Sequence, residues 1–269
     1  MDRPLIVLRA APAALRGAPH LVALGAVRIV DGEVQESFES LVCPPVPIEP
    51  DAAAEHGVTE RAVRAAPLAA QCVAGFADWV GEAWMAAHDA RRDGEALAYE
   101  LARAGVETPP GPMLDGKQLA ERHLADAPDR ELETLAAWLE LESGERSGVL
   151  ADAVQAWKVI EECLERAGGG TRPADVLAAG GRPLGLAALG PRAAKTSPRH
   201  RSLERARVEG RRVAVLYGEE EGEAPARIEV VPRFLFGRGE HGYMEAECVA
   251  SGLLKTYRLD RVRKVVEAE

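Results

Sequence analysis

Aromatic residues are scarce in this sequence of 269 residues, because Phe, Trp and Tyr together make up only 4% of it. A core must therefore be built mainly from Ala, Val and Leu, and the apolar content of 47% is enough for one large domain or two smaller ones. Cysteine is also rare, and no C-x-x-C pair occurs, which argues against a zinc site or a redox pair and favours a reduced compartment. The four cysteines are Cys43, Cys72, Cys163 and Cys248.

Long apolar runs are absent as well. No basic stretch followed by an apolar leader opens the sequence, and no uninterrupted apolar run approaches the roughly 20 residues that span a bilayer. We therefore expect a soluble, unsecreted protein of the bacterial cytoplasm with no membrane partner.

The net charge of −10 argues against nucleic acid as a partner, but the charge is unevenly distributed. Residues 195–269 contain about 15 basic and about 13 acidic side chains, so this part is near +2 and the remainder near −12. The segment 195–212 is the most basic, with seven Lys or Arg residues against Glu204 and Glu209. A contact with a polyanion is therefore expected in the C-terminal part.

The organisation of the chain changes at a Gly- and Pro-rich stretch. We predict a first domain over residues 1–168, a linker over 169–198 and a second domain over 199–269. In the first domain, Asp31-Gly32 joins two apolar segments as a tight hairpin, and another strand is expected at 84–87. Helical periods occur at 68–80, 94–104, 117–123, 131–141 and 150–167, which predicts a sheet covered by helices. Short β-like segments after the linker predict a small antiparallel sheet or barrel: 212–216, 227–236, 243–249, 254–259 and 262–266.

Five ordered segments of the first domain carry a family resemblance. They are "LVALGAVRIVDGEVQESFESLVCPPVPIEPDAAAEHGVTERAVRAAP", "MAAHDARRD", "PMLDGKQLAERHL", "ETLAAWLEL" and "VLADAVQAW". Together they resemble the DnaQ-like 3'-5' exonucleases of the DEDD class, and the resemblance implies an α/β, ribonuclease H-like exonuclease fold. In that family, acidic residues hold two divalent metal ions and a His activates the attacking water.

The resemblance implies specific positions for these groups. The D-x-E motif of the first strand falls on Leu8 and Ala10, so both carboxylates are absent there. The second acidic motif ends on Asp93 and the last one on Asp152, and both acids are retained. The general-base His is replaced by Ser147.

Loss of two metal carboxylates and the proton acceptor predicts a pseudoenzyme that does not degrade nucleic acid. Asp93 and Asp152 are then remnant acidic positions, either solvated or helix-capping, with a weak metal or cation site as the alternative. We expect no cofactor, and Mg²⁺ or Mn²⁺ only if the chain is an active nuclease. Other side chains could in principle rebuild a metal shell: Glu55, His56, His88, Asp89 and Asp115.

The second domain resembles a WYL domain, a small Sm-like all-β barrel. "RRVAVLYG", "IEVVPRFLF", "HGYMEAECV" and "TYRLDRVRKV" carry this resemblance, although Gly242 stands for the Trp of the signature and Met244 for its Leu. The resemblance implies a ligand-sensing or nucleic-acid-binding module. Guanidinium groups beside tyrosine rings suit phosphates and a stacked base, and a solvated surface with internal ion pairs is the alternative. The candidate ligand-binding residues are Arg211, Tyr243, Tyr257, Arg258, Arg261 and Arg263.

We interpret the chain as a non-catalytic exonuclease-like protein with a WYL module, acting as a nucleic-acid or nucleotide-binding adaptor or regulator. Single-stranded nucleic acid or a nucleotide would bind the C-terminal domain, and a protein partner could bind the acidic N-terminal domain. One alternative is a residual metal-dependent 3'-5' exonuclease. Another is a scaffold for protein interaction or oligomerisation. No helix-turn-helix pattern precedes the barrel, so direct reading of an operator is not expected.

Overall fold

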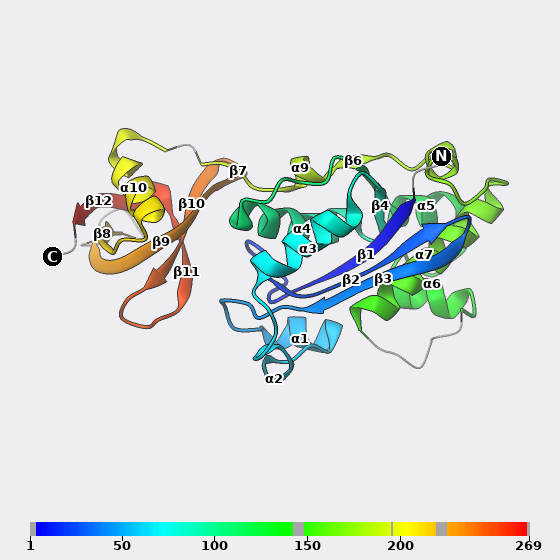
Figure 1. Ribbon diagram of the computed structural model, residues 1–269, viewed down its shortest axis with the longest axis horizontal. Coiled ribbons are helices and arrows are strands. Elements are labelled where there is room, and N and C mark those ends of the chain that lie inside the picture. Colours follow the sequence, from blue (N-terminus) through cyan, green and yellow to red (C-terminus); the bar gives the residue numbers. More distant parts are fainter. Residues whose placement is uncertain (1–3, 142–147, 195, 219–224, 268–269) are drawn as a thin grey trace. The chain divides into compact units, whose positions relative to one another are not determined.

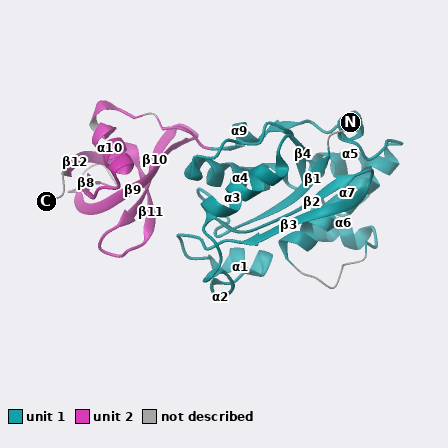
Figure 2. Ribbon diagram, viewed as in Figure 1, with its two compact units in different colours: residues 1–190 teal, residues 191–269 magenta. Residues whose placement is uncertain are grey.

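The computed structural model describes residues 4–141, 148–194, 196–218 and 225–267 and divides the chain into two compact units, Met1–Gly190 and Pro191–Glu269 (Figure 2). This division differs from the linker predicted over 169–198. Much of that segment belongs to unit 1, because it contains the helix α8 (Pro173–Ala178) and the strand β6 (Leu184–Gly185), which pairs with the sheet.

The described part of unit 1 contains a mixed sheet in the order β3-β2-β1-β4-β5-β6 (Figure 1). The strand β1 pairs antiparallel with β2 and parallel with β4, while β5 is parallel to β4 and antiparallel to β6. The bounds are Leu5–Pro12 for β1, Leu21–Val30 for β2, Glu33–Leu41 for β3, Trp84–Ala87 for β4 and Pro112–Asp115 for β5. The predicted α/β, ribonuclease H-like architecture is confirmed.

The hairpin predicted at Asp31-Gly32 is confirmed, because β2 and β3 pair antiparallel on either side of it. Asp31 and Gly32 have φ values of 50° and 86°, the left-handed backbone that a two-residue hairpin turn needs. A second glycine, Gly25 in β2, is required by packing. A Cβ there would lie 2.6 Å from backbone atoms of Val149 and Leu150, so a helix begins directly against the strand.

Helices cover both faces of the sheet (Figure 1). On one face, Leu8 of β1 belongs to an apolar cluster with Phe76 and Leu97. On the other face, Val7 belongs to a cluster with Ile160. Within the described ranges, no helix is both long and apolar enough to cross a bilayer. The remaining helices of unit 1 are α1 (Pro50–His56), α2 (Glu60–Val63), α3 (Ala69–Val80), α4 (Ala90–Ala104), α5 (Gly116–His123), α6 (Leu132–Trp138), α7 (Val149–Arg166) and α9 (Leu186–Leu189).

In its described part, unit 2 is an antiparallel sheet with one main helix. Its strands follow the order β11-β10-β9-β8-β12, and β7 (Arg192–Ala193) pairs with β9. The predicted strands are confirmed as β8 (Val213–Tyr217), β9 (Ala226–Arg238), β10 (His241–Cys248), β11 (Leu254–Arg258) and β12 (Val262–Glu267). The helix α10 (Arg201–Glu209), which the sequence analysis did not predict, places Leu203 and Ala206 in the same apolar cluster as Val215 and Met244.

Candidate functional site

A cluster of charged side chains lies at the carboxyl end of β1. We call it the Arg9 cluster, and its members are Arg9, Glu55, Arg92, Asp93 and Asp152. Arg9 belongs to β1 and Glu55 to α1, whereas Asp93 and Asp152 lie in the first turns of α4 and α7. Because β1 is parallel to β4, and α4 follows β4 in the chain, the topology brings the beginning of α4 to the end of β1.

Asp93 is the most deeply buried acid of this cluster, with a side chain only 1% exposed. Its Oδ1 accepts hydrogen bonds from Arg9 Nη1 at 2.9 Å and from the backbone N–H of Ala10 at 3.2 Å. Its Oδ2 is buried and has no hydrogen-bond partner among the described residues. Burial raises the pKa of Asp93 to about 6, although the charge of Arg9 opposes this shift.

Arg9 connects three carboxylates and is itself only 13% exposed. Besides Asp93, its Nη2 lies 3.0 Å from Glu55 Oε1 and its Nε lies 3.5 Å from Asp152 Oδ2. Burial alone would lower the pKa of Arg9, but the charge and hydrogen bond of Asp93 outweigh it and raise the pKa. Glu55 also pairs with Arg92. The guanidinium of Arg9 therefore remains charged and holds the three acids together.

The side chains of Leu8 and Ala10 do not belong to the Arg9 cluster. Both side chains are fully buried in the apolar cluster that includes Phe76, and Ala10 reaches Asp93 only through its backbone. Successive side chains of a strand point to opposite faces, and the side chain that reaches the acids is the one between them, Arg9. The third predicted position, Ser147, lies outside the described residues.

Arg9 was not predicted as a site residue, although the sequence around it carried a usable signal. Arg9 interrupts a strand of apolar residues whose burial is otherwise almost complete. An arginine in such a position is rarely tolerated without a carboxylate partner. Asp93 and Asp152, the two retained acids, were the natural partners to consider.

The other polar groups considered for a metal shell have local structural roles. His56 accepts a hydrogen bond from the Val58 N–H at Nδ1, so its Nε2 carries the proton and donates a hydrogen bond to the carbonyl oxygen of Pro12, with 3.0 Å between nitrogen and oxygen. His88 Nε2 lies 2.7 Å from the carbonyl oxygen of Arg130. The carboxylates of Asp89 and Asp115 accept hydrogen bonds from the first backbone N–H groups of α4 and α5 and cap these helices.

The side chains of the Arg9 cluster do not fit the two-metal site that the resemblance implies. A guanidinium lies against both retained acids, where such a site needs cations coordinated by carboxylate oxygens. Among the described residues, no group of three or more His, Cys, Asp or Glu side chains is arranged to hold a metal ion. The arrangement instead satisfies the acids with an internal cation.

In unit 2, Tyr243 and Arg258 face each other across the β10–β11 ladder. The ring of Tyr243 stacks on Phe236 with centroids 5.4 Å apart and planes 20° apart. Arg258 Nη2 lies 3.2 Å from Nδ1 of His241, and the guanidinium also pairs with Asp260, whose pKa it lowers. An aromatic platform thus lies beside a half-exposed guanidinium group.

The other candidates of unit 2 do not all join this platform. Tyr257 is 6% exposed and packs edge-on against Tyr217 in the apolar cluster of the unit, so it is a core residue. Arg211 pairs with Glu209 at the end of α10. Arg261 lies in the short 3₁₀ turn between β11 and β12, and its carbonyl accepts the Gly218 N–H. Exposed Arg263 lies on β12.

Comparison with known proteins supports the two parts separately. Residues 198–267 match the family model of the WYL domain. The PolC-type DNA polymerase III of Oceanobacillus iheyensis is 27% identical over 150 residues, which is 54% of this chain and 10% of the polymerase. The PolC-type enzyme of Caldanaerobacter subterraneus is 25% identical over 147 residues, again 10% of its length. The chain thus spans about a tenth of these relatives.

Solved structures agree on the fold. The nuclease domain of 3'hExo, a DEDDh family member bound to rAMP, superposes with a TM-score of 0.52 at 13% identity. The match covers 61% of this chain and 92% of that domain. Exonuclease I gives a TM-score of 0.54 at 11% identity, covering 99% of this chain and 65% of its own. The chain therefore consists of a DnaQ-like exonuclease domain of the DEDD class followed by a C-terminal WYL domain.

Proposed function

We propose that the exonuclease-like domain is non-catalytic and that the chain acts as a nucleic-acid-binding adaptor or regulator. The observation that carries this proposal is the position of Arg9, whose guanidinium contacts Asp93 and Asp152. Phosphodiester cleavage in this family depends on divalent cations held by such carboxylates. Here the guanidinium of Arg9 already pairs with those carboxylates.

A divalent ion would compete with Arg9 for these carboxylates. To bind a divalent ion, Asp93 must first lose its contact with Arg9, and the displaced guanidinium must find another partner. Breaking a buried ion pair by removing one partner costs about 3–5 kcal/mol. A cation would have to recover this free energy before it gained any net affinity.

Binding without cleavage is supported by the second unit. Tyr243 stacks on Phe236 and has Arg258 as its cross-strand neighbour, so an aromatic face and a cation lie together. Single-stranded nucleic acids are bound by this combination, because every base has a π-face and every linkage carries a charge. The net charge near +2 of residues 195–269, against near −12 for the remainder, favours the same unit.

A nuclease assay tests the first half of the proposal. End-labelled single-stranded DNA and RNA are incubated with the purified full chain and Mg²⁺ or Mn²⁺, alongside the Asp93→Asn variant. We expect intact oligonucleotides with both proteins. Metal-dependent trimming by the wild type that disappears in Asp93→Asn would overturn the proposal, while trimming that persists in the variant identifies a contaminating nuclease.

Fluorescence anisotropy with a labelled single strand of about 20 nucleotides tests the second half. We expect binding that weakens steeply with salt, because neutralised phosphates release counterions. Tyr243→Ala should lose about 1–3 kcal/mol of binding free energy, or roughly 5- to 150-fold in affinity, whereas Tyr243→Phe keeps the ring and should bind as the wild type does. Absence of binding at low salt would refute the adaptor role.

A further inference from the structure

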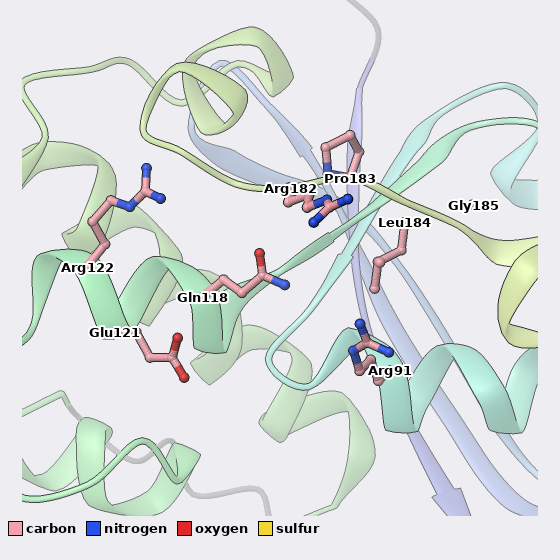
Figure 3. A pocket seen from close by; sticks show the side chains of 8 residues that line it. All are labelled: Arg91, Gln118, Glu121, Arg122, Arg182, Pro183, Leu184 and Gly185. Atoms are coloured by element: carbon pink, nitrogen blue, oxygen red, sulfur yellow. The ribbon is translucent and has the colours of Figure 1, made fainter.

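A cleft of about 720 Å³ lies in unit 1, separate from the Arg9 cluster (Figure 3). We call it the arginine cleft. Its lining comes from α4, α5 and the segment that forms β6: Arg91, Gln118, Glu121, Arg122, Arg182, Pro183, Leu184 and Gly185. Figure 3 shows that three separate segments of the chain each contribute an arginine to it.

The charge of the cleft contrasts with its surroundings. Three arginines and one glutamate line it, which gives +2 in a chain whose net charge is −10. Arg91, Arg122 and Arg182 are exposed, and the structure gives none of them an ion-pair partner within the described residues. By contrast, Arg9 and Arg28 of the same unit pair with carboxylates.

The walls of the cleft are fixed by contacts that do not use the arginines. β6 is held in the sheet by pairing of Met113 with Leu184 and of Pro112 with Gly185. At the other end, His123 Nε2 of α5 lies 2.7 Å from the carbonyl oxygen of Ala179. The three arginines therefore project from segments held by the sheet and by α5, and little rearrangement of backbone is needed to bind a ligand.

The cleft is also distinct from the site at Arg9. Arg91 and Asp93 both lie in the first turn of α4. Residues two positions apart on an α-helix point about 200° away from each other, so Arg91 faces away from the buried Asp93. The cleft therefore presents positive charge on a different side of the helix.

We propose that the arginine cleft binds the phosphodiester backbone of single-stranded nucleic acid, an inference that rests on the proposed binding function and assigns it a second contact surface. Guanidinium groups bind phosphate oxygens with paired hydrogen bonds, and the carboxamide of Gln118 adds a further donor. The lining offers few apolar groups and no aromatic ring, so it suits the backbone of a strand and not a base.

The test compares two triple variants of the full chain with the same change in charge. The cleft variant carries Arg91→Gln, Arg122→Gln and Arg182→Gln. The control carries Arg16→Gln, Arg61→Gln and Arg64→Gln, which replaces arginines that are also exposed. Anisotropy with a labelled single strand is measured from about 50 to about 200 mM salt, and unchanged unfolding midpoints verify that both variants are folded.

For single strands, each neutralised phosphate contributes about 0.7 to the slope of log K against log salt, so the cleft variant should bind more weakly with a slope shallower by about 2. The control variant should keep the wild-type slope. Equal losses in both variants, or no loss in the cleft variant, would overturn the inference, as would a cleft-dependent affinity for a mononucleotide without any effect on the strand. If the wild type binds no strand at all, the proposed function itself has failed.

Discussion

Replacing Arg9 with methionine removes the guanidinium while keeping an unbranched side chain of similar length. The change leaves Asp93, which is 1% exposed, with one backbone hydrogen bond and no counter-ion. Leaving one partner of a buried pair uncompensated costs about 3–5 kcal/mol. Because a domain is typically stable by about 5–15 kcal/mol, Arg9→Met should remove a large share of the stability of unit 1.

Tryptophan fluorescence during urea unfolding measures this loss selectively. All four tryptophans belong to unit 1, so the signal is not affected by unfolding of unit 2: Trp79, Trp84, Trp138 and Trp157. The free energy of unfolding is obtained for the wild type, for each single variant and for the double variant.

The double variant Arg9→Met with Asp93→Asn is the decisive comparison. Its two neutral side chains remove the uncompensated charge, so its stability should return to within about 2 kcal/mol of the wild type. Manganese should also raise the unfolding midpoint of Arg9→Met and not that of the wild type, because the single variant leaves Asp93 and Asp152 without the guanidinium of Arg9. A loss below about 1 kcal/mol in Arg9→Met, or losses that simply add in the double variant, would refute the reasoning.

Two further predictions concern packing and pH. Gly25→Ala should destabilise unit 1 by about 1–3 kcal/mol or more, because the new methyl would meet the start of α7. Gly75→Ala, in open space on α3, should instead stabilise it by about 0.5–1 kcal/mol. Equal changes in unfolding free energy in urea would contradict this difference. Burial opposes ionisation of Glu100, but hydrogen bonding from His20 and the charge of Arg103 lower its pKa. The ionised form therefore stabilises the fold above the ordinary pKa of about 4.3, and this contribution is lost as the pH falls through the lowered pKa. Glu100→Gln should therefore be less stable than the wild type near neutral pH, and the difference in unfolding free energy should shrink in acid. A difference that does not change with pH would contradict this role of Glu100.

Strong local signals made much of the fold predictable. Asp31-Gly32 gave the β2–β3 hairpin, and regular apolar spacing gave α3, α5 and α7 within one or two residues of their observed ends. Two strands of unit 1 were missed for physical reasons. β5 has four residues and begins with Pro112, and β6 has two, so neither is long enough to have a period of its own.

The candidate site was less predictable, because it depends on which face of β1 each residue occupies. A shift of one position along a strand exchanges the two faces, so the motif alone could not distinguish Leu8 from Arg9. Tyr243 and Tyr257 were likewise equivalent in the sequence. The ladder register places Tyr243 beside Arg258 and leaves Tyr257 in the core.

The Arg9 cluster has a consequence for how the domain responds to its surroundings. A bound metal ion exchanges with solvent, so its occupancy follows the cation concentration and falls when a chelator is added. The guanidinium is attached to the chain and is present at all times at a high effective concentration beside Asp93. The surface formed by the carboxyl end of β1 and the first turns of α4 and α7 is therefore expected to keep one shape whatever the supply of magnesium. A partner that recognises this surface by its shape would require such constancy.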